Sequence, residues 1–209
     1  MKFTESSFKG RNLTLWRGDR CLFQNLGFTL GNSEWMHVMG GNGSGKTTLL
    51  RVLCGLSMAE SGDILWNDRR IDRSRFDYHS SMIYMGHLEG LKGDMNPEEN
   101  LRFHYQLRDK QAGERIEMAI ERMGLQRCRT LSCRYLSAGQ RRRAALARFL
   151  VSQATLWILD EPFANLDVKG RELVEEIVSE HLEKGGMAIL AAHHDMQISS
   201  GTEVPVELS

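Results

Sequence analysis

The pattern of apolar and polar residues divides the chain into three parts: short strands, then helices, then strands with a helix between them. In the first quarter, brief apolar runs are separated by Gly, Asn and Asp, which is typical of strands joined by turns. These runs predict strands at 12–16, 20–23, 27–30 and 34–39. A glycine-rich loop follows and leads into a helical run at 47–54, which Gly55 can end. Further short strands are expected at 63–66 and 82–85.

The middle of the chain, from about Asn96 to Gln153, has the spacing of helices. Asn96 is a suitable helix cap, Pro97 fits the first turn, and acidic residues follow at the positive end of the helix dipole. Apolar residues between 116 and 123 recur at helical intervals until Gly124 ends the run. Several consecutive helices are therefore predicted here.

Two apolar strands, at 155–160 and 187–193, flank a helical stretch at 168–184 near the C-terminal end. Strand, loop, helix, helical insert, strand, helix and strand in this order predict an α/β fold. We expect the helical block to be an insert on that core.

Composition limits the possible functions. The chain has 209 residues and is 41% hydrophobic, enough for one well-buried domain. Lys plus Arg and Asp plus Glu are both 27, so the basic surplus typical of nucleic-acid binders is missing, and we expect no nucleic-acid partner. We find no signal-peptide core or apolar run of spanning length, so we expect a cytosolic chain. The scattered cysteines lack the paired spacing of zinc sites and are expected to be reduced core thiols.

A phosphate-binding loop is predicted between the strand at 34–39 and the following helix, because its residues fit the pattern G-x-x-x-x-G-K-[ST]. Glycines let consecutive backbone N–H groups approach the phosphates, and the helix start adds its positive end. Lys46 should reach the β- and γ-phosphates, the Thr47 hydroxyl should bind Mg²⁺, and Thr48 supports the helix start. The predicted nucleotide-binding residues here are Gly40, Gly41, Asn42, Gly43, Ser44, Gly45, Lys46, Thr47 and Thr48.

Two acids, Asp160 and Glu161, end the apolar strand at 155–160. Ligands of α/β sheets lie at the carboxyl ends of strands, so Asp160 is a candidate Mg²⁺ partner and Glu161 a candidate base for the attacking water. The alternative is that both acids simply begin a solvated turn at Pro162.

A third feature is the segment Leu136–Gln140, which precedes a helix with an apolar side. Ser137 and Gln140 have capping-box spacing, so Ser137 is expected to cap this helix. Taken alone, this segment favours an ordinary capped helix with a solvated face at Arg141–Arg143, because capping boxes are frequent.

Together these motifs resemble the ABC ATPase family, from about residue 10 to residue 195. LSAGQ is similar to the LSGGQ signature with Ala138 in place of a glycine, DEPFANLD to the Walker B and D-loop segment with Asp167 as its acid, and LAAHHD to the switch-histidine segment. In that last segment His193 is preferred as the switch over His194.

The resemblance implies a P-loop NTPase (RecA-like) core with an N-terminal antiparallel β-subdomain and an inserted α-helical subdomain. It makes 1–209 a single ATP-binding domain, with the core at 1–87 and 154–209 and the helical subdomain at 88–153. It also implies a head-to-tail homodimer with two ATP sites, in which Ser137, Gly139 and Gln140 of one subunit complete the site of the other. Glu161 and His193 would be catalytic, and ATP and Mg²⁺ would be bound.

Two positions depart from the family pattern. His87 stands where the family has a Q-loop glutamine; it either contacts water or metal in the site or only packs at the subdomain joint. Near the adenine-stacking position, Arg17 is better aligned and is assigned to the nucleotide, while Trp16 is the more obvious stacking residue or a core residue.

Within the family, the sequence is most similar to the subfamily of ATPases that supply the bacterial haem exporter of cytochrome c maturation. This implies integral membrane partner subunits, contacted through a groove that Leu88–Asn100 would line, and a peripheral location at the cytoplasmic face of the inner membrane. No direct haem binding is expected on a subunit that supplies ATP energy. The alternatives are another small-cargo transporter, a soluble ABC ATPase acting on DNA or ribosomes, and another phosphate-loop class.

Overall fold

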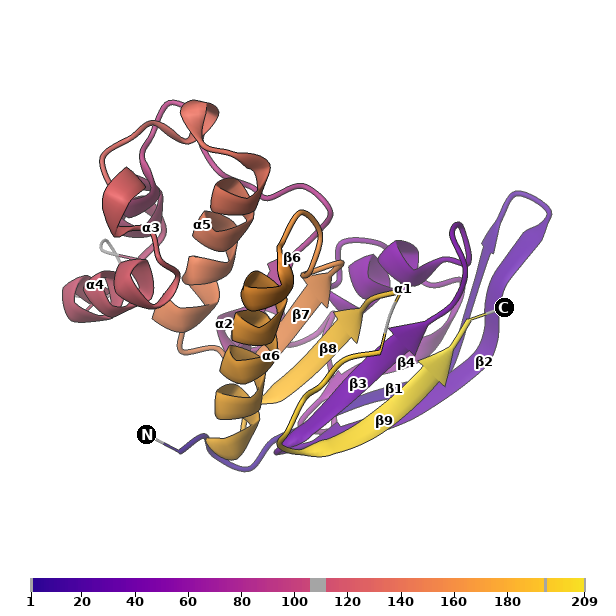
Figure 1. Cartoon of the computed structure of the whole chain (residues 1–209). Coiled ribbons are helices and arrows are strands. Elements are labelled where there is room, and N and C mark those ends of the chain that lie inside the picture. The colour runs from indigo at the N-terminus through magenta and orange to yellow at the C-terminus, as the bar shows by residue number, and fades with distance from the viewer. Residues whose placement is uncertain (1, 106–111, 194, 209) are drawn as a thin grey trace.

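The structure is a computed structural model that describes residues 2–105, 112–193 and 195–208. It contains an antiparallel sheet, a parallel sheet and a block of helices at one side, as Figure 1 shows. The predicted α/β class is confirmed. Among the described residues, no helix is both long and apolar enough to cross a bilayer.

The antiparallel sheet has the strand order β2-β1-β4-β5. Its strands are β1 (Ser7–Arg17), β2 (Arg20–Gly31), β4 (Ser61–Trp66) and β5 (Arg69–Arg70). The two strands predicted at 20–23 and 27–30 are one strand, and that prediction was wrong. Pairing with β1 continues across a shift in register, where Asn12 and Asn25 have positive φ values of 50° and 52°, so a bulge absorbs the polar interruption.

The parallel sheet has the order β6-β7-β8-β3-β9. Its strands are β6 (Met82–Met85), β7 (Leu156–Asp160), β8 (Met187–Ala191), β3 (Glu34–Met39) and β9 (Thr202–Glu207). Strand β9 was not predicted from the sequence, and it contains Pro205. Proline is tolerated because β9 is an edge strand, where only one side needs backbone donors.

Both faces of the parallel sheet are buried. Along β7, Leu156 and Ile158 belong to the core shared with the antiparallel sheet and helix α1 (Lys46–Leu53). Trp157 and Leu159 belong to the opposite core, which includes α6 (Val168–Glu183) and the helical block. Helix α1 therefore lies between the two sheets, and the phosphate loop that precedes it is placed at the carboxyl edge of the parallel sheet.

The helical block comprises α3 (Pro97–Tyr105), α4 (Ala112–Arg122), two 3-10 turns (Gln126–Cys128 and Cys133–Tyr135) and α5 (Ala138–Val151). The predicted cap at Asn96 is confirmed: its side-chain oxygen accepts the Glu99 N–H at 2.8 Å, and the Glu99 carboxylate accepts the Asn96 N–H at 2.9 Å. The predicted helix end at Gly124 is also confirmed by its left-handed backbone, with a φ of 66°. Helix α2 (Arg75–Ser81) was not predicted.

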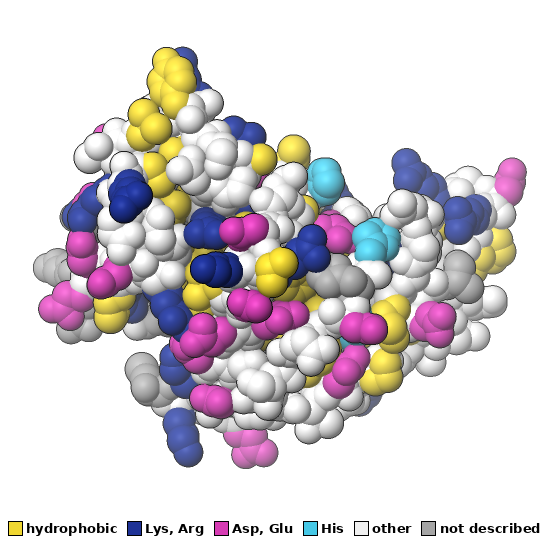
Figure 2. Space-filling view, viewed as in Figure 1, with side chains coloured by type: hydrophobic (Ala, Val, Ile, Leu, Met, Phe, Trp, Pro, Cys, Tyr) yellow, Lys and Arg dark blue, Asp and Glu magenta, His cyan; other side chains and the backbone are white. Residues whose placement is uncertain are grey.

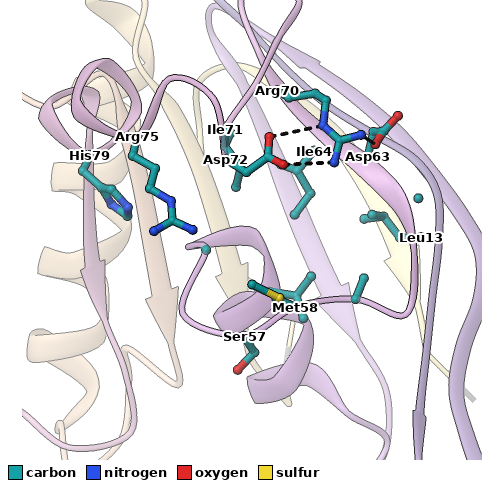
Figure 3. A pocket seen from close by; sticks show the side chains of 14 residues that line it. Leu13, Ser57, Met58, Asp63, Ile64, Arg70, Ile71, Asp72, Arg75 and His79 are labelled. Atoms are coloured by element: carbon teal, nitrogen blue, oxygen red, sulfur yellow. Dashed lines mark hydrogen bonds and ion pairs between the residues drawn. The ribbon is translucent and has the colours of Figure 1, made fainter.

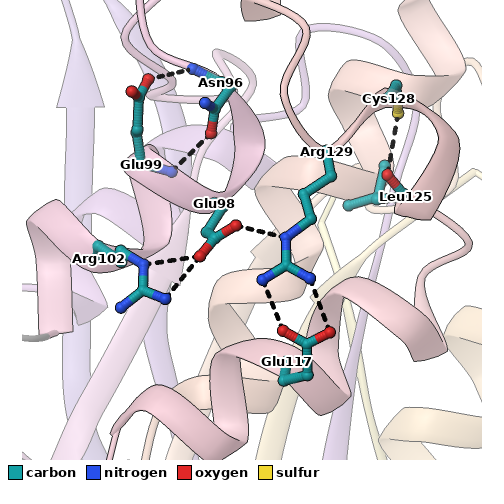
Figure 4. A network of polar contacts seen from close by, with 8 residues as sticks. All are labelled: Asn96, Glu98, Glu99, Arg102, Glu117, Leu125, Cys128 and Arg129. Carbon is teal, nitrogen blue, oxygen red and sulfur yellow. Dashed lines mark hydrogen bonds and ion pairs between the residues drawn. The ribbon is translucent and has the colours of Figure 1, made fainter.

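A network of ion pairs connects α3 and α4 with the first 3-10 turn (Figure 4). The Glu98 carboxylate accepts from Arg129 and from Arg102, the latter at 2.6 Å, and Arg129 also contacts Glu117 at 2.6 Å. Hydrogen bonding from Arg129, with a smaller contribution from Arg102, lowers the pKa of Glu98 to about 2. This network covers the solvent side of the block, where water screening keeps each pair weak.

His181 of α6 is buried at the amino end of the sheet. Its ring stacks on Trp157 with centroids 3.9 Å apart, and Nε2 donates to the carbonyls of Thr155 (3.0 Å) and Met187 (3.2 Å). Burial lowers the pKa of His181 to about 4, so the imidazole is neutral at physiological pH.

The four cysteines are free thiols, as expected; Cys54, Cys128 and Cys133 are buried and Cys21 is half-buried. Burial raises the pKa of Cys54, which keeps this thiol protonated and suits its place in the core.

Candidate active site

The predicted phosphate loop connects β3 to α1, as the sequence pattern requires. Gly45, the residue before the helix, has a φ of 105°, and a Cβ built on it would lie 3.2 Å from the Leu22 side chain. Gly43 has a φ of 79°, a backbone conformation that residues other than glycine rarely adopt. The turn therefore needs glycine at both positions for backbone reasons alone.

Lys46, the first residue of α1, folds back over its own loop. Its ammonium donates to the carbonyls of Gly40 (2.7 Å) and Gly41 (3.1 Å), and it lies 3.5 Å from Nδ1 of His193. The residue is 7% exposed, so its charge is concentrated at the floor of the loop, where an anion would arrive.

A cleft of about 520 Å³ opens beside this loop. The residues that line it come from the N-terminal sheet, the phosphate loop, the segment after β6 and the ends of β7 and β8: Arg17, Arg20, Leu22, Asn42, Gly43, Gly45, Lys46, Thr47, Thr48, His87, Glu161 and His193. Arg20 was not predicted for the site. The sequence shows only that it begins the strand predicted at 20–23, which does not indicate a nucleotide contact.

Three predicted loop residues do not line the cleft. Gly40 has no space for a side chain, because a Cβ would lie 2.5 Å from the Ser44 hydroxyl and 2.6 Å from the Leu208 carbonyl. Ser44 is buried, and its hydroxyl has no hydrogen-bond partner among the described residues. Gly41 is exposed but contributes no surface to the cleft.

The two acids of β7 have different surroundings. Asp160 is 1% exposed, and its Oδ2 has no hydrogen-bond partner within the described ranges. Glu161 lines the cleft, has a positive φ of 50°, and donates its N–H to the carbonyl of Ala191 at 2.9 Å. The alternative of a merely solvated turn is therefore wrong for Asp160, which is buried.

His193 links the acid to the loop lysine. Its Nε2 lies 3.1 Å from Oε1 of Glu161, while Nδ1 faces the Lys46 ammonium. The structure thus brings three predicted residues from the ends of two parallel strands and the start of α1 to one place. His194, the alternative switch residue, lies outside the described residues.

The unpartnered oxygen of Asp160 provides a test of whether a cation fits. Mg²⁺ prefers one or two carboxylates together with hydroxyl, water and phosphate oxygens. Asp160 supplies a buried carboxylate oxygen and Thr47 a hydroxyl group beside the cleft. Among the described residues, no group of three or more His, Cys, Asp or Glu side chains is arranged to hold a metal ion.

The structure also gives the positions of the residues that depart from the family pattern, His87, Arg17 and Trp16. His87 is exposed and lines the cleft, which disfavours the interpretation in which it only packs at a joint. Arg17 lines both this cleft and an adjoining hollow of about 370 Å³, whereas Trp16 lines only the hollow. Trp16 is 42% exposed, so the interpretation of Trp16 as a core residue is wrong.

The signature segment lies elsewhere on the same subunit. Ser137 caps α5 as predicted: its hydroxyl accepts the Gln140 N–H at 3.2 Å, and the Gln140 side chain accepts the Ser137 N–H at 2.9 Å. Ser137 and Gln140 are exposed, Gly139 is half-buried, and none of the three lines the cleft. Helix α5, at whose start they lie, belongs to the helical block (Figure 1).

The alternative of a solvated arginine face on α5 is wrong for Arg142, and its two neighbours are half-buried. Arg142 is 2% exposed, Arg143 contacts Asp167 at 3.0 Å, and Arg141 donates to the Leu136 carbonyl at 2.7 Å. Asp167 also caps α6 by accepting the Gly170 N–H, a bond that lowers the pKa of this carboxyl, with a further contribution from Arg143. Helical spacing alone did not indicate that residues 160–162 and Asp167 contact this side of α5.

Another hollow, of about 210 Å³, lies between α1, β4 and α2 (Figure 3). Arg70 bridges Asp63 (2.5 Å) and Asp72 (3.0 Å) at its edge, and Arg75 and His79 of α2 extend beside it. None of the residues predicted for nucleotide or metal lines this hollow, so it is separate from the phosphate-loop cleft.

The space-filling view in Figure 2 shows one face of the molecule on which acidic and basic side chains are interspersed. That face has no continuous basic surface of the kind that a nucleic-acid backbone requires.

Comparison with known proteins agrees with this geometry. The family model of the ABC transporter matches residues 23–164. The chain belongs to the ABC transporter family as an ATP-binding subunit, and ATP hydrolysis is the general activity of such proteins.

The relatives of this chain include cytochrome c biogenesis ATP-binding export proteins, CcmA. The protein from Methylococcus capsulatus is 47% identical over 183 residues, which cover 87% of this chain and 88% of the relative. The protein from Nitrosomonas europaea is 46% identical over 193 residues, which cover 92% of this chain and 91% of the relative. The subfamily resemblance seen in the motifs is thereby confirmed.

A solved structure described as the ATP-binding subunit of an ABC transporter superposes with a TM-score of 0.79. It is 23% identical and covers 89% of this chain and 79% of the other. At that identity the likeness supports the fold alone, and it confirms the predicted P-loop core.

Proposed function

We propose that two copies of this chain bind two ATP molecules between them, head to tail, and hydrolyse them to drive membrane-embedded export subunits in c-type cytochrome biogenesis, with haem as the cargo. The main support is one observation: the cleft joins a phosphate loop with Glu161 and His193, yet contains none of the signature residues. The signature residues that the cleft lacks would come from a second subunit.

The phosphates would bind to the backbone of the loop at 42–45 and to the Lys46 ammonium. Three features favour an anion here: the left-handed glycines, the start of α1 and the nearly buried lysine charge. Arg17 and Arg20 line the outer side of the cleft, where a guanidinium can pair with phosphate oxygens or stack on the adenine ring.

Thr47 and Asp160 would hold Mg²⁺, directly or through water. When bound, the cation neutralises charge on the β- and γ-phosphate oxygens. The buried Asp160 oxygen without a partner supports this assignment, because such a group is costly to keep in a protein that does not use it.

Glu161 would accept a proton from the attacking water, and His193 would orient the water and the carboxylate. Their contact at 3.1 Å and their shared position on the cleft wall support these roles. His87 also lines the cleft and is suited to contact the same water. Phosphoryl transfer depends mainly on positioning and charge neutralisation, so each of these groups can have a large effect on the rate.

Ser137, Gly139 and Gln140 would contact the γ-phosphate bound to the partner subunit. The exposed start of α5 offers a hydroxyl and backbone N–H groups at the positive end of a helix. Since ADP lacks the γ-phosphate, these contacts would favour the closed dimer only with ATP.

The proposed membrane-subunit contact is the segment 88–100, through its exposed residues. Leu88 is 83% exposed and lies in the segment that leaves the cleft at His87. The cargo assignment is supported by the relatives, whose names describe export in cytochrome c biogenesis. It implies a peripheral location on the cytoplasmic face of the inner membrane. Mass spectrometry of the intact assembly, purified with coexpressed membrane subunits, tests the partners and the cargo.

The dimer is tested by disulfide crosslinking of Asn42→Cys with Ala138→Cys, in a chain whose half-buried Cys21 is replaced by Ser. ATP together with Glu161→Gln should give covalent dimers, and ADP should give few. If ATP-loaded chains form the bond only within single chains, the head-to-tail proposal is wrong. The single-cysteine variants are the controls.

A further inference from the structure

Arg142 is a charged side chain in an unusual place: it lies in the second turn of α5 and is 2% exposed. Burial of a guanidinium is unfavourable unless its donors are used, and here burial lowers the pKa of Arg142. Within the described residues it forms no ion pair with a carboxylate, so its hydrogen bonds must compensate.

Those bonds go to three consecutive backbone carbonyls, that of the last residue of β7 and those of the two residues after it. Nη2 donates to Asp160 at 3.0 Å and also to Glu161, and Nε donates to Pro162 at 3.2 Å. A planar fork of donors can satisfy acceptors that diverge in this way, whereas the single ammonium of lysine cannot reach all three with good geometry.

The turn that Arg142 contacts is the one that orients the proposed base. Glu161 has a φ of 50°, a conformation that costs free energy for a residue other than glycine. Its carbonyl accepts from Arg142 and from the Ala164 N–H at 3.1 Å, and its own N–H binds Ala191. With both backbone groups bonded, the carboxylate lies on the cleft wall beside His193.

We propose that Arg142 is a positioning residue, which keeps the backbone of Glu161 in the left-handed conformation required for hydrolysis. Because Ser137 caps the start of α5, the same helix carries the signature segment at one end and this contact one turn later. A shift of α5 caused by the partner's nucleotide would therefore move the catalytic turn of its own subunit. This inference rests on the proposed function, in which Glu161 is the base.

The neighbouring arginines extend the same connection. Arg143 contacts Asp167 at the start of α6, and Arg141 lies 3.6 Å from Glu89 in the segment after His87. These two pairs are partly exposed, whereas the Arg142 contacts are buried, so Arg142 is the member of the run with the strongest effect on the turn.

The first test needs no hydrolysis. Hydrogen exchange measured by mass spectrometry on the 209-residue chain should show faster exchange at 160–164 in Arg142→Lys than in the unchanged chain, by about 10-fold or more. Exchange in α1 should be the same in both. Arg127→Lys, at an exposed arginine of the first 3-10 turn, is the matched control and should change neither segment. Unchanged exchange at 160–164 in Arg142→Lys would overturn the proposal.

The second test is a double-mutant cycle on ATP turnover in the assembly with coexpressed membrane subunits. Arg142→Lys should lower kcat by about 10²-fold, the usual cost of a misplaced catalytic group, with the Kd for ATP within about 2-fold. In a Glu161→Gln background the same change should have no further effect on kcat, since Arg142 acts through Glu161. Arg142→Met should behave in the same way and more strongly if it folds.

Two outcomes separate this inference from the proposed function. If Glu161→Gln itself turns over at the unchanged rate, Glu161 is not the base and the proposed function fails first. If Glu161→Gln is slowed as expected but Arg142→Lys keeps full turnover, or lowers ATP affinity and kcat together in both backgrounds, only the positioning role of Arg142 is wrong.

Discussion

Polar groups at the two ends of the parallel sheet differ in how well they are hydrogen-bonded and in backbone strain. At the amino end, His181 is neutral, stacks on Trp157 and donates from Nε2 to two carbonyls, so packing and hydrogen bonding hold its ring in place. At the carboxyl end, Asp160 has a buried oxygen without a partner among the described residues, and Glu161 has a left-handed backbone.

The difference separates stability from reactivity along the same strands. Groups whose hydrogen bonds are satisfied contribute to folding, whereas an unpartnered buried carboxylate oxygen next to a strained residue that lines a cleft is typical of a place where a ligand or a reaction uses these groups. Substitutions at the carboxyl end should therefore change turnover with little loss of stability. Substitutions at the amino end should do the reverse.

The largest effect is expected from Glu161→Gln. Loss of the proposed base should lower kcat by about 10³-fold, equivalent to about 4 kcal/mol, while the Kd for ATP stays nearly constant. Thermal unfolding should shift little, because the amide keeps the size of the carboxylate. Steady-state turnover together with equilibrium nucleotide binding measures both, and wild-type turnover would remove Glu161 as the base.

The next largest effect is expected at the amino end, from Gly186→Ala. A Cβ on Gly186 would overlap the His181 imidazole, so the ring must leave its two carbonyls and its stack on Trp157. We expect a loss of about 3 kcal/mol in the free energy of unfolding, measured by urea denaturation. Gly113→Ala, where nothing lies within 4 Å of the new carbon, is the control. ATP affinity measured at a temperature where both variants are folded should be unchanged.

Stability should also depend on pH through His181. Its folded-state pKa is lowered to about 4 from 6.5, so the neutral ring stabilises the fold fully above pH 6.5. That stabilisation, about 3 kcal/mol, is lost as the pH falls from 6.5 towards 4, because the unfolded chain binds the proton first. His181→Gln keeps a donor but does not titrate. The difference in unfolding free energy between the two chains should shrink across this pH range, and a constant difference would contradict the assignment.

The smallest effect is expected from Asp160→Asn. Replacing a buried carboxylate that lacks a partner should raise the unfolding free energy of the nucleotide-free chain by about 1 kcal/mol. The same change should abolish the dependence of ATP binding on Mg²⁺. Calorimetry without nucleotide and titrations with and without Mg²⁺ test both parts; a destabilised chain that still responds to Mg²⁺ would contradict the role of Asp160.

Much of this protein was predictable because its signals are local. The glycines of the phosphate loop, the acids that end β7 and the caps at Asn96 and Ser137 each follow from the chemistry of a few neighbouring residues. Such patterns hold wherever the segment folds, since backbone angles and nearby hydrogen bonds determine them.

Three features could not be predicted, because distant segments decide them. Strand β2 is continuous only because β1 pairs along its whole length, and β9 exists only because the open edge of β3 accepts it. Arg142 cannot be told apart from Arg141 and Arg143 in the sequence, and it is buried because the end of β7 and the following turn pack against it.

The sequence by itself thus determined the local chemistry of this protein: where a phosphate can bind, which acids end a strand and where helices begin. The tertiary structure alone decided which of those groups meet, which lose their water and which remain for a second subunit. The physical reason is that burial and long-range hydrogen bonds depend on what packs against a residue, and a residue's sequence neighbours carry little of that information.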